Sequence, residues 1–432
     1  MLSLLFLAYM LGFADRVIFG LVMKPIKAAY LLTDSELGLL AGIAFAASYA
    51  VFSPVGAFIV DRLPRRLVLP SAVAFWSVAT AGTALAPSFW WLFVARAGVG
   101  VGEALLHPLA VSLLSDTYGP ERRARAFGVY LGAGALGIML INLLGGGLLA
   151  HIGREPISFP FGSLEPWQTL FLAAGVLGLA LALLSLVMLR DLGDGDGHKT
   201  LVHAHDGGVA AYIASHPAVS AAILIGVPFL TMGGYTLNLW VIPFFERVHG
   251  WAAGTAGLSI ALTCNAAAVV GCLLVGRFAS GFRERVGTNA PFLLAAFGGV
   301  VFVACSSTAL LVPSETASLG MLMVAFFWTF FTPVCGYTAI AEVVPRQLRA
   351  RITGLLTLAT GLITNSLGPY LAGVLTDRLF PATDGLRYSI AVTVIGSGLI
   401  GIVLLLSGLR GYGRVVRLQQ AHEDAAPLQS AG

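Results

Sequence analysis

The chain has 432 residues, of which 57% are hydrophobic and only 11% are charged, and its formal net charge is +4. A soluble domain carries about 25% charged residues on the surface that it exposes to water, so this composition excludes a soluble protein and, with it, a soluble enzyme. It predicts that most of the surface faces lipid and that the lipid bilayer is a partner of the chain.

The apolar residues are gathered in stretches that are long enough to cross a membrane, which takes about 20 residues of helix. The predicted fold is all-α and polytopic, with twelve transmembrane helices. The first helix is long and contains a charged pair, which argues against a cleaved signal peptide. The helices are predicted at residues 2–23, 36–59, 67–86, 88–114, 126–150, 168–189, 218–244, 254–279, 290–311, 317–341, 353–376 and 388–408.

Charged residues inside the first and fourth helices are the main functional signal. Each ionisable residue within a membrane costs about 2.5–3.5 kcal/mol and marks a functional site by default. The first helix carries Asp15 and Arg16. The fourth carries Arg96, Glu103 and His107, which share one helical face at about 100° per residue. We expect a network between these two helices, in which the adjacent Asp15 and Arg16 point to different partners.

These residues predict two roles. Arg16 and Arg96, with His107, are predicted to bind an anionic head group, because a guanidinium offers a planar fork of donors. Asp15 or Glu103 is predicted to take up a proton, which changes its pairing with arginine and biases the equilibrium between two states. The alternative is a static buried ion network that only orders the helices, in which His107 forms a hydrogen bond to a neighbour.

A polar stretch and an internal repeat divide the chain into two halves. The longest polar stretch follows the sixth predicted helix. The run Asp116-x6-Arg123-Ala124-Arg125-x2-Gly128 after the fourth helix returns as Glu342-x6-Arg349-Ala350-Arg351-x2-Gly354 after the tenth. Equivalent loops in two halves are typical of transporters that are built from repeats. The predicted domains are an N-terminal six-helix bundle at 1–190, a cytoplasmic linker at 191–216, and a C-terminal bundle with a short tail at 217–432.

The second half carries aromatic and amide residues where the first half carries charge. A cavity between a charged half and an aromatic half suits an amphiphile, whose tail would lie against the aromatic rings. The alternative is that these residues face lipid or neighbouring helices, and that the asparagines form hydrogen bonds between helices. The candidate substrate-binding residues of this half are Tyr235, Asn238, Trp240, Trp328 and Asn365.

The basic residues and the cysteines limit topology and chemistry. Seventeen of the 25 basic residues fall in loops on one side of the membrane and six on the other, which places both termini in the cytoplasm. The net charge follows from this bias and does not indicate nucleic-acid binding. The four cysteines lie inside predicted helices without zinc-ligand spacing, so we expect free thiols, no metal site and no cofactor.

Two motifs resemble those of the major facilitator superfamily. The run Gly56-x4-Asp61-Arg62-x2-Arg65-Arg66 resembles its signature loop between the second and third helices, and Arg96-x3-Gly100-x-Gly102 resembles its fourth-helix motif. Within the superfamily, the chain most resembles the spinster branch in its bacterial form. That likeness is carried by Ala14-Asp15-Arg16-Val17-Ile18-Phe19-Gly20, by Asp34-Ser35-x-Leu37-Gly38-Leu39-Leu40, and by Arg96 with Gly102-Glu103-Ala104.

The resemblance implies a monomeric secondary transporter of the bacterial inner membrane that works by alternating access. Its substrate would be a lysolipid or sphingoid amphiphile such as sphingosine 1-phosphate, with proton coupling. The fifth helix has Gly145-Gly146-Gly147 without the adjacent proline of many antiporters, which leaves antiport open. The resemblance also implies a cytoplasmic gate that stabilises the outward-facing state, although the alternative is a simple excess of arginine on that side. The gate residues are Asp61, Arg62, Arg66, Asp116 and Arg125.

Three other functions remain open at this stage. A membrane enzyme acting on lipids would need a nucleophile and a base, for which Glu103 and His107 are the one candidate pair. A channel or passive flippase would share the fold without accumulating substrate. An organic-anion or drug transporter of the same superfamily would use Arg16 and Arg96 equally well.

Overall fold

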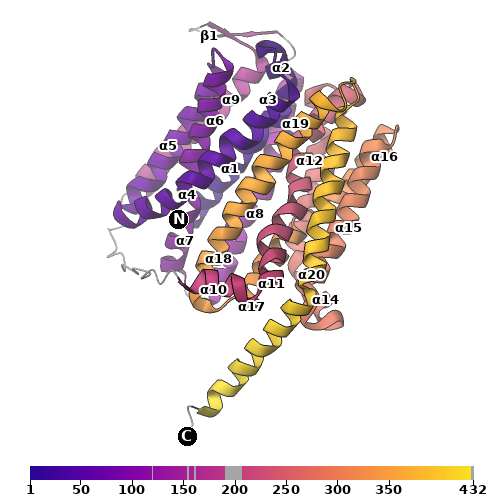
Figure 1. Ribbon diagram of the computed structural model, residues 1–432. Coiled ribbons are helices and arrows are strands. Elements are labelled where there is room, and N and C mark those ends of the chain that lie inside the picture. The colour runs from indigo at the N-terminus through magenta and orange to yellow at the C-terminus, as the bar shows by residue number, and fades with distance from the viewer. Residues whose placement is uncertain (119, 153–154, 160–161, 190–206, 430–432) are drawn as a thin grey trace.

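The protein is helical along its described length, apart from one short β-hairpin. The computed structural model describes residues 1–118, 120–152, 155–159, 162–189 and 207–429 (Figure 1). The hairpin consists of two antiparallel strands, β1 (Ile157–Phe159) and β2 (Gly162–Leu164).

The helices before residue 190 are long and apolar, and short irregular turns interrupt them. In chain order they are α1 (Leu2–Leu21), α2 (Met23–Tyr30), α3 (Asp34–Gly38), the π-helical turn η1 (Leu39–Ile43), α4 (Ala44–Arg62), α5 (Arg65–Ala84), α6 (Phe89–Glu103), α7 (Leu106–Thr117), α8 (Pro120–Ile152) and α9 (Pro166–Met188).

The helices after residue 206 follow a similar plan. They are α10 (Gly207–Ser215), α11 (Pro217–Ala221), η2 (Ala222–Gly226), α12 (Val227–Val248), α13 (Ala253–Ile260), η3 (Ala261–Asn265), α14 (Ala266–Val286), η4 (Gly287–Asn289), α15 (Ala290–Leu311), α16 (Glu315–Trp328), α17 (Phe331–Val343), α18 (Arg346–Ala359), η5 (Thr360–Leu367), α19 (Gly368–Arg378) and α20 (Leu386–Gln429).

The predicted membrane helices are all helical in the structure. Among the described residues, ten helical stretches are long and apolar enough to cross a membrane. One of them, Ala253–Leu311, contains both the eighth and the ninth predicted helix. The eleventh predicted helix, 353–376, runs through α18, η5 and α19. The predicted all-α membrane fold is therefore confirmed.

The fourth predicted helix, 88–114, is not continuous. Helix α6 ends at Glu103 and α7 begins at Leu106, with a tight turn between them. The cause is Pro108, because a proline inside a helix donates no hydrogen bond and its ring clashes with the carbonyl four residues earlier, here that of Ala104. The break falls directly after one of the predicted proton carriers.

The tenth predicted helix, 317–341, is broken in the same way. Helix α16 ends at Trp328 and α17 begins at Phe331. Pro333 lies four residues after Thr329 in this break, as Pro108 does after Ala104. Both halves therefore contain a discontinuous helix at the same place in their order, which in repeat-built transporters points to the binding region.

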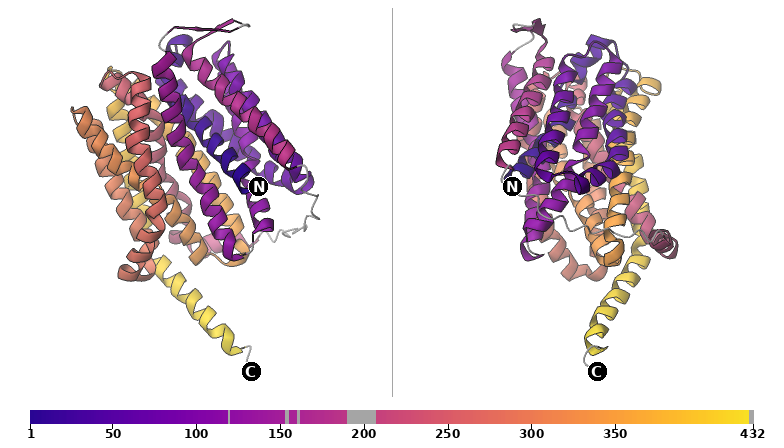
Figure 2. Two further views of the ribbon diagram at one scale, coloured as in Figure 1. Left: turned by 180° about the vertical axis from the view of Figure 1, so that it is seen from behind. Right: turned by 90° about the vertical axis from the view of Figure 1, so that its left-hand side faces the viewer.

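The bundle has two distinguishable ends. The hairpin end carries β1, β2 and α2, whereas the C-terminal part of α20 extends beyond the opposite end, which we call the tail end (Figures 1 and 2). One buried apolar cluster lies within residues 4–189 and another within residues 212–416, and a third combines residues of both parts. The division at 191–216 stays a prediction.

The two parts approach each other closely at the hairpin end, where α3 packs against α19. A Cβ atom at Gly38 would lie only 2.5 Å from the carbonyl oxygen of Pro369, so no larger residue fits there without a shift of backbone. Helix α1 likewise contacts α12, and α8 contacts α13. These contacts are among those that join the first part of the chain to the second.

Candidate functional site

The charged residues of the first and fourth predicted helices meet inside the bundle. The Arg16 side chain donates from Nε to Glu103 Oε2 at 2.8 Å, and its Nη2 lies 2.6 Å from the same oxygen. Arg96 Nη1 donates to the backbone oxygen of Asp15 at 3.0 Å. Asp15, Arg96 and Glu103 are each at most 2% exposed. The structure thus contains the contact between the two helices that their spacing predicts.

Asp15 and Arg16 turn to different helices, as expected for neighbours about 100° apart on a helix. Arg16 reaches α6, where Glu103 lies, whereas the Asp15 carboxylate accepts a hydrogen bond from Thr80 on α5 at 2.8 Å. Thr80 was not among the residues predicted from the sequence, because a hydroxyl inside an apolar helix carries no charge signal.

Three aromatic rings surround the Arg16 guanidinium. Its central carbon lies 4.5 Å from the ring centre of Phe13, 4.8 Å from that of Phe45 and 5.3 Å from that of Tyr49. Such cation–π contacts are worth about 2 kcal/mol when desolvated. Phe45 and Tyr49 are four residues apart on α4, and this helical spacing is the one sequence signal that places them together.

A glycine brings α4 close enough for these contacts. A Cβ atom at Gly100 of α6 would overlap the backbone oxygen of Phe45, so α4 and α6 pack with almost no gap at this level. The glycine of the Arg96-x3-Gly100 motif therefore has a local structural task. It lets α4 approach α6 so closely that the ring of Phe45 lies over Arg16, which pairs with Glu103 of α6.

Several polar atoms of this site have no hydrogen-bond partner among the described residues. They include Arg96 Nε and Nη2, Glu103 Oε1 and Asp15 Oδ1. A buried polar group without a partner costs about 1–3 kcal/mol, and more if it is charged, so native proteins rarely leave one unsatisfied. Four such atoms in one place indicate a site that is built to receive a polar group.

His107 lies next to this site but beyond the helix break. Its ring centre is 6.1 Å from that of Tyr130, and it interacts electrostatically with Arg16. The spacing argument assumed one continuous helix from Arg96 to His107, and the turn after Glu103 interrupts it. Ala104 and Leu105, at the turn, keep right-handed helical φ and ψ angles, so His107 follows Glu103 at nearly helical spacing.

Tyr235 and Asn238, two of the predicted residues of the second half, each have a buried polar atom without a hydrogen-bond partner among the described residues. Tyr235 of α12 interacts electrostatically with Arg16 and Arg96, and its buried hydroxyl has no hydrogen-bond partner among the described residues. Asn238, one turn further along α12, has a buried Oδ1 atom in the same condition. Their role in substrate binding stays a prediction, and the structure brings Tyr235 to the arginines.

The other predicted residues of the second half lie elsewhere. Trp240 is fully buried, and its indole N–H donates to the carbonyl of Pro369 at 3.2 Å. Asn365 lies in η5, where its backbone packs against Gly42 of η1. Trp328 packs against Phe331, with ring centres 4.5 Å apart. The structure therefore does not gather these three side chains around Arg16 and Arg96.

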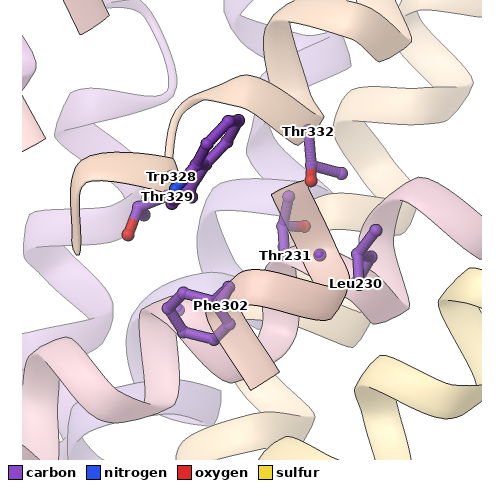
Figure 3. A pocket seen from close by; sticks show the side chains of 8 residues that line it. Leu230, Thr231, Phe302, Trp328, Thr329 and Thr332 are labelled. Atoms are coloured by element: carbon purple, nitrogen blue, oxygen red, sulfur yellow. The ribbon is translucent and has the colours of Figure 1, made fainter. Parts of the chain in front are cut away.

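A small pocket lies beside the second helix break (Figure 3). Its volume is ≈ 10 Å³, which is about the space of one water molecule and excludes an amphiphile. Trp328 is the last residue before this break, whereas Glu103 is the last before the first break. The equivalent positions of the two halves thus differ in charge. The pocket is lined by Leu230, Thr231, Gly234, Gly299, Phe302, Trp328, Thr329 and Thr332.

The predicted gate lies at the tail end. The side chains of Asp61, Asp116 and Arg125 lie outside the described residues. The guanidinium of Arg62 stacks on the ring of Phe58, 3.8 Å from its centre, and Arg66 lies at the start of α5. The gate role of all five residues stays a prediction.

An ion cluster at the hairpin end joins the two halves and was not predicted. Asp34 accepts from Arg247 Nη1 at 2.8 Å and Nη2 at 2.6 Å, and from Lys27 at 2.7 Å. Asp377 accepts from the backbone N–H groups of Asp34 and Ser35, so it caps the N-terminus of α3. A cavity of ≈ 360 Å³ is lined in part by Lys27, Asp34 and Arg247.

We expect the substitution Arg247→Gln to favour separation of the halves at this end. It removes two charge-assisted hydrogen bonds that are worth about 1.5–3 kcal/mol each, so the ratio of open to closed molecules should rise about tenfold or more. The measurement is the distance between spin labels at Leu85→Cys and Pro313→Cys, two exposed positions of this end, in a protein without its native cysteines.

The matched control for this prediction is Arg387→Gln, which removes an arginine of α20 at the same end. It should leave the label distances unchanged. Exchanging the charges, in the double variant Asp34→Arg with Arg247→Asp, should restore the short distance. Equal distance distributions for Arg247→Gln and the unsubstituted protein would show that the cluster does not hold the halves together.

Comparison with known proteins identifies the family to which this chain belongs. A family model described as Major Facilitator Superfamily matches residues 5–369. An MFS-type efflux pump of Mycolicibacterium smegmatis is 27% identical over 371 residues, which are 85% of this chain and 82% of that protein. Protein spinster homolog 1 of Homo sapiens is 32% identical over 123 residues, 28% of this chain and 23% of that protein.

Solved structures show the same likeness over nearly the whole chain. The crystal structure of a bacterial homolog of the human lysosomal transporter spinster, inward-facing and unoccupied, has a TM-score of 0.81 and 26% sequence identity, and the match covers 96% of this chain and 97% of that one. The inward-facing, occupied form has a TM-score of 0.75 and covers 96% of both chains. The likeness thus extends well beyond the short motifs of the first half.

Proposed function

Since this chain belongs to the Major Facilitator Superfamily and is related to its spinster branch, we propose that it is a proton-coupled secondary transporter of an anionic amphiphile. Family membership makes it an integral membrane transporter and not an enzyme. The proposed substrate class is a lysophospholipid or a sphingosine 1-phosphate-like lipid. The observation that carries the proposal is the buried pair of Arg16 and Glu103 beside an Arg96 with unpartnered N–H groups.

Arg96 is the proposed head-group ligand. Its Nε and Nη2 atoms are buried and have no partner among the described residues, whereas Arg16 already holds Glu103 and lies among three rings. A guanidinium binds phosphate or carboxylate through two parallel hydrogen bonds. Two N–H groups in a dry environment thus favour a head group with an anionic phosphate or carboxylate over an uncharged one.

Glu103 is the proposed proton carrier. In its charged form it pairs with Arg16, and a proton on the carboxylate removes that attraction. An anion bound at Arg96 and the charged Glu103 repel each other, because both belong to one buried site of low dielectric constant. Binding of the substrate therefore favours proton uptake by Glu103, and this linkage lets a proton gradient drive transport.

Alternating access is supported by the closed hairpin end. Three helix pairs and the ion cluster of Asp34 and Arg247 join the halves there. The solved relatives of highest TM-score quoted above are described as inward-facing. With the tail end on the cytoplasmic side of a bacterial membrane, as the arginine bias predicts, a closed hairpin end is a feature that an inward-facing state requires.

A second candidate is an exporter of organic anions or drugs. It is favoured by one observation, the similarity of 85% of the chain to an MFS-type efflux pump. Arg96 serves an organic anion in the same way as a phosphate. The two candidates differ in the need for an acyl chain, which an experiment can vary directly.

Transport by the purified protein in liposomes tests the proposal. The probe is fluorescent lysophosphatidylglycerol, with lysophosphatidylcholine as the zwitterionic control and benzenesulfonate as the small organic anion. We expect lysophosphatidylglycerol to accumulate under an imposed pH gradient and the accumulation to collapse with a protonophore. Transport of benzenesulfonate alone supports the second candidate, and equilibration without accumulation refutes proton coupling.

A further inference from the structure

Three hydroxyl residues of helix α5 are buried, and one of them behaves differently from the other two. Ser77, Thr80 and Thr83 are each at most 1% exposed. Ser77 donates to the carbonyl of Val73 at 2.6 Å, and Thr83 donates to that of Ala79 at 3.2 Å, both four residues earlier on the same helix.

Thr80 instead reaches across the bundle. Its hydroxyl donates to Asp15 Oδ2 at 2.8 Å. A buried Ser or Thr in a helix commonly donates to the carbonyl four residues earlier. Thr80 donates instead to a carboxylate that is distant in sequence. Asp15 Oδ1 has no partner among the described residues, which leaves Thr80 as the side chain that fixes this carboxylate.

A threonine hydroxyl can serve both forms of the carboxyl group. It donates to the charged carboxylate, as the structure shows. When the carboxyl group carries a proton, the same oxygen accepts that proton in a hydrogen bond, and its own hydrogen turns to the carbonyl of Trp76, four residues earlier, as in Ser77 and Thr83. The exchange needs only rotation about χ1 and χ2 of one side chain.

We propose that Thr80 is a positioning residue for Asp15, holding its carboxylate toward α5 and setting the pH at which it takes up a proton. The inference rests on the proposed proton-coupled transport and assigns Asp15 a proton site separate from that of Glu103. The separation has a geometric basis, because Asp15 faces Thr80 on α5 while Glu103 faces Arg16.

Few other titratable groups act on Asp15. The charged groups that face it are Arg96 and Glu103, both on α6. Of the other helices packed on α1, α12 places Tyr235 beside Arg96, α8 places Tyr130 beside Arg16 and Glu103, and α7 places His107 beside Arg16. Helix α9 contains no titratable residue. The hydroxyl of Thr80 is the one neutral donor to this carboxylate among the described residues.

The test compares Thr80→Val, which keeps the shape of the side chain and removes the hydroxyl, with Thr80→Ser, which keeps the hydroxyl. The readout is the pH dependence of lysophosphatidylglycerol uptake in liposomes. The hydrogen bond to the charged carboxylate is stronger than the one to the protonated form, because it is charge-assisted, so its loss in Thr80→Val should move the midpoint to higher pH by about one unit. Thr80→Ser should keep the original midpoint.

Thr83→Val is the matched control, because it removes an equally buried hydroxyl of the same helix that bonds only to its own backbone. Its midpoint should not move. If Thr80→Val does not fold, Thr80→Ala removes the hydroxyl with less bulk and the same midpoint shift is expected. An unchanged midpoint in either variant that folds overturns the inference.

Asp15→Asn separates this inference from the proposed function. If Asp15→Asn keeps the original pH profile, Asp15 takes no part in coupling and the assignment of Thr80 fails with it. If Asp15→Asn alters the profile while Thr80→Val does not, only the Thr80 inference fails. The inference requires that Thr80→Val has no further effect on the pH profile in the Asp15→Asn background.

Discussion

Substitution of Glu103 by glutamine is expected to abolish proton-driven accumulation of lysophosphatidylglycerol while leaving the chain in the membrane. The amide has almost the shape of the carboxylate but carries no charge at any pH, so proton uptake can no longer change its pairing with Arg16. The measurement is uptake into liposomes over a range of pH. We expect the remaining, gradient-independent flux to lose the pH dependence that Glu103 contributes and to keep the part that Asp15 sets.

The same substitution also has a cost in stability. Glu103 is 2% exposed and neutralises Arg16, and removing one partner of a buried pair costs about 3–5 kcal/mol because the other charge stays buried. The double variant Arg16→Gln with Glu103→Gln removes both charges and should recover much of the lost thermal stability without recovering coupling. This separates a defect of coupling from a defect of folding.

The control variant is Glu246→Gln, which removes another buried carboxylate, 7% exposed, that lies in α12 outside the site. Its uptake should keep the original pH dependence. A Glu103→Gln protein with the pH profile of the unsubstituted chain would remove Glu103 from the coupling role and leave Asp15 as the candidate.

Substitution of Arg96 by glutamine is expected to weaken binding of the anionic probe by about 10- to 100-fold, because one or two charge-assisted hydrogen bonds contribute about 1.5–3 kcal/mol. Arg96 is 1% exposed, so water cannot replace the lost donors easily. The measurement is the dissociation constant of lysophosphatidylglycerol for the purified protein. Affinity for an uncharged monoacylglycerol, which has no phosphate, should change little.

Arg96→Lys is the graded variant for this prediction. Lysine keeps the charge but lacks the planar fork, so we expect an intermediate loss of affinity. The equivalent change at Arg16 should act more on pH dependence than on affinity, because Arg16 already holds Glu103. Equal losses for lysophosphatidylglycerol and uncharged monoacylglycerol in Arg96→Gln would contradict a head-group role and indicate a general structural defect.

Much of the fold could be predicted from hydropathy. Lipid requires runs of about 20 apolar residues, and such runs are visible without any tertiary information. The helix breaks were missed because Pro108 and Pro333 lie inside apolar runs, where hydropathy alone does not distinguish a continuous helix from two shorter ones. The breaks place Glu103 at the end of α6 and Trp328 at the end of α16.

The charged members of the site could also be predicted, but most of their partners could not. Asp15, Arg16, Arg96 and Glu103 are conspicuous because few residues of this kind occur inside apolar helices. Thr80 carries no charge and so does not stand out in an apolar helix. The aromatic residues around Arg16 are of types that occur throughout membrane helices. The ion pair of Asp34 and Arg247 joins residues 213 positions apart, which no local pattern relates.

The sequence by itself determined that this protein is an integral membrane protein and which few charged residues lie inside its apolar helices. Both follow from residue type and from the apolar residues nearby, because these set the free-energy cost of burying a charge. Only the tertiary structure decided which of those charges meet. Arg16 pairs with Glu103, Asp15 turns to Thr80, and Asp34 binds Arg247, since each pairing depends on how helices distant in sequence pack against one another.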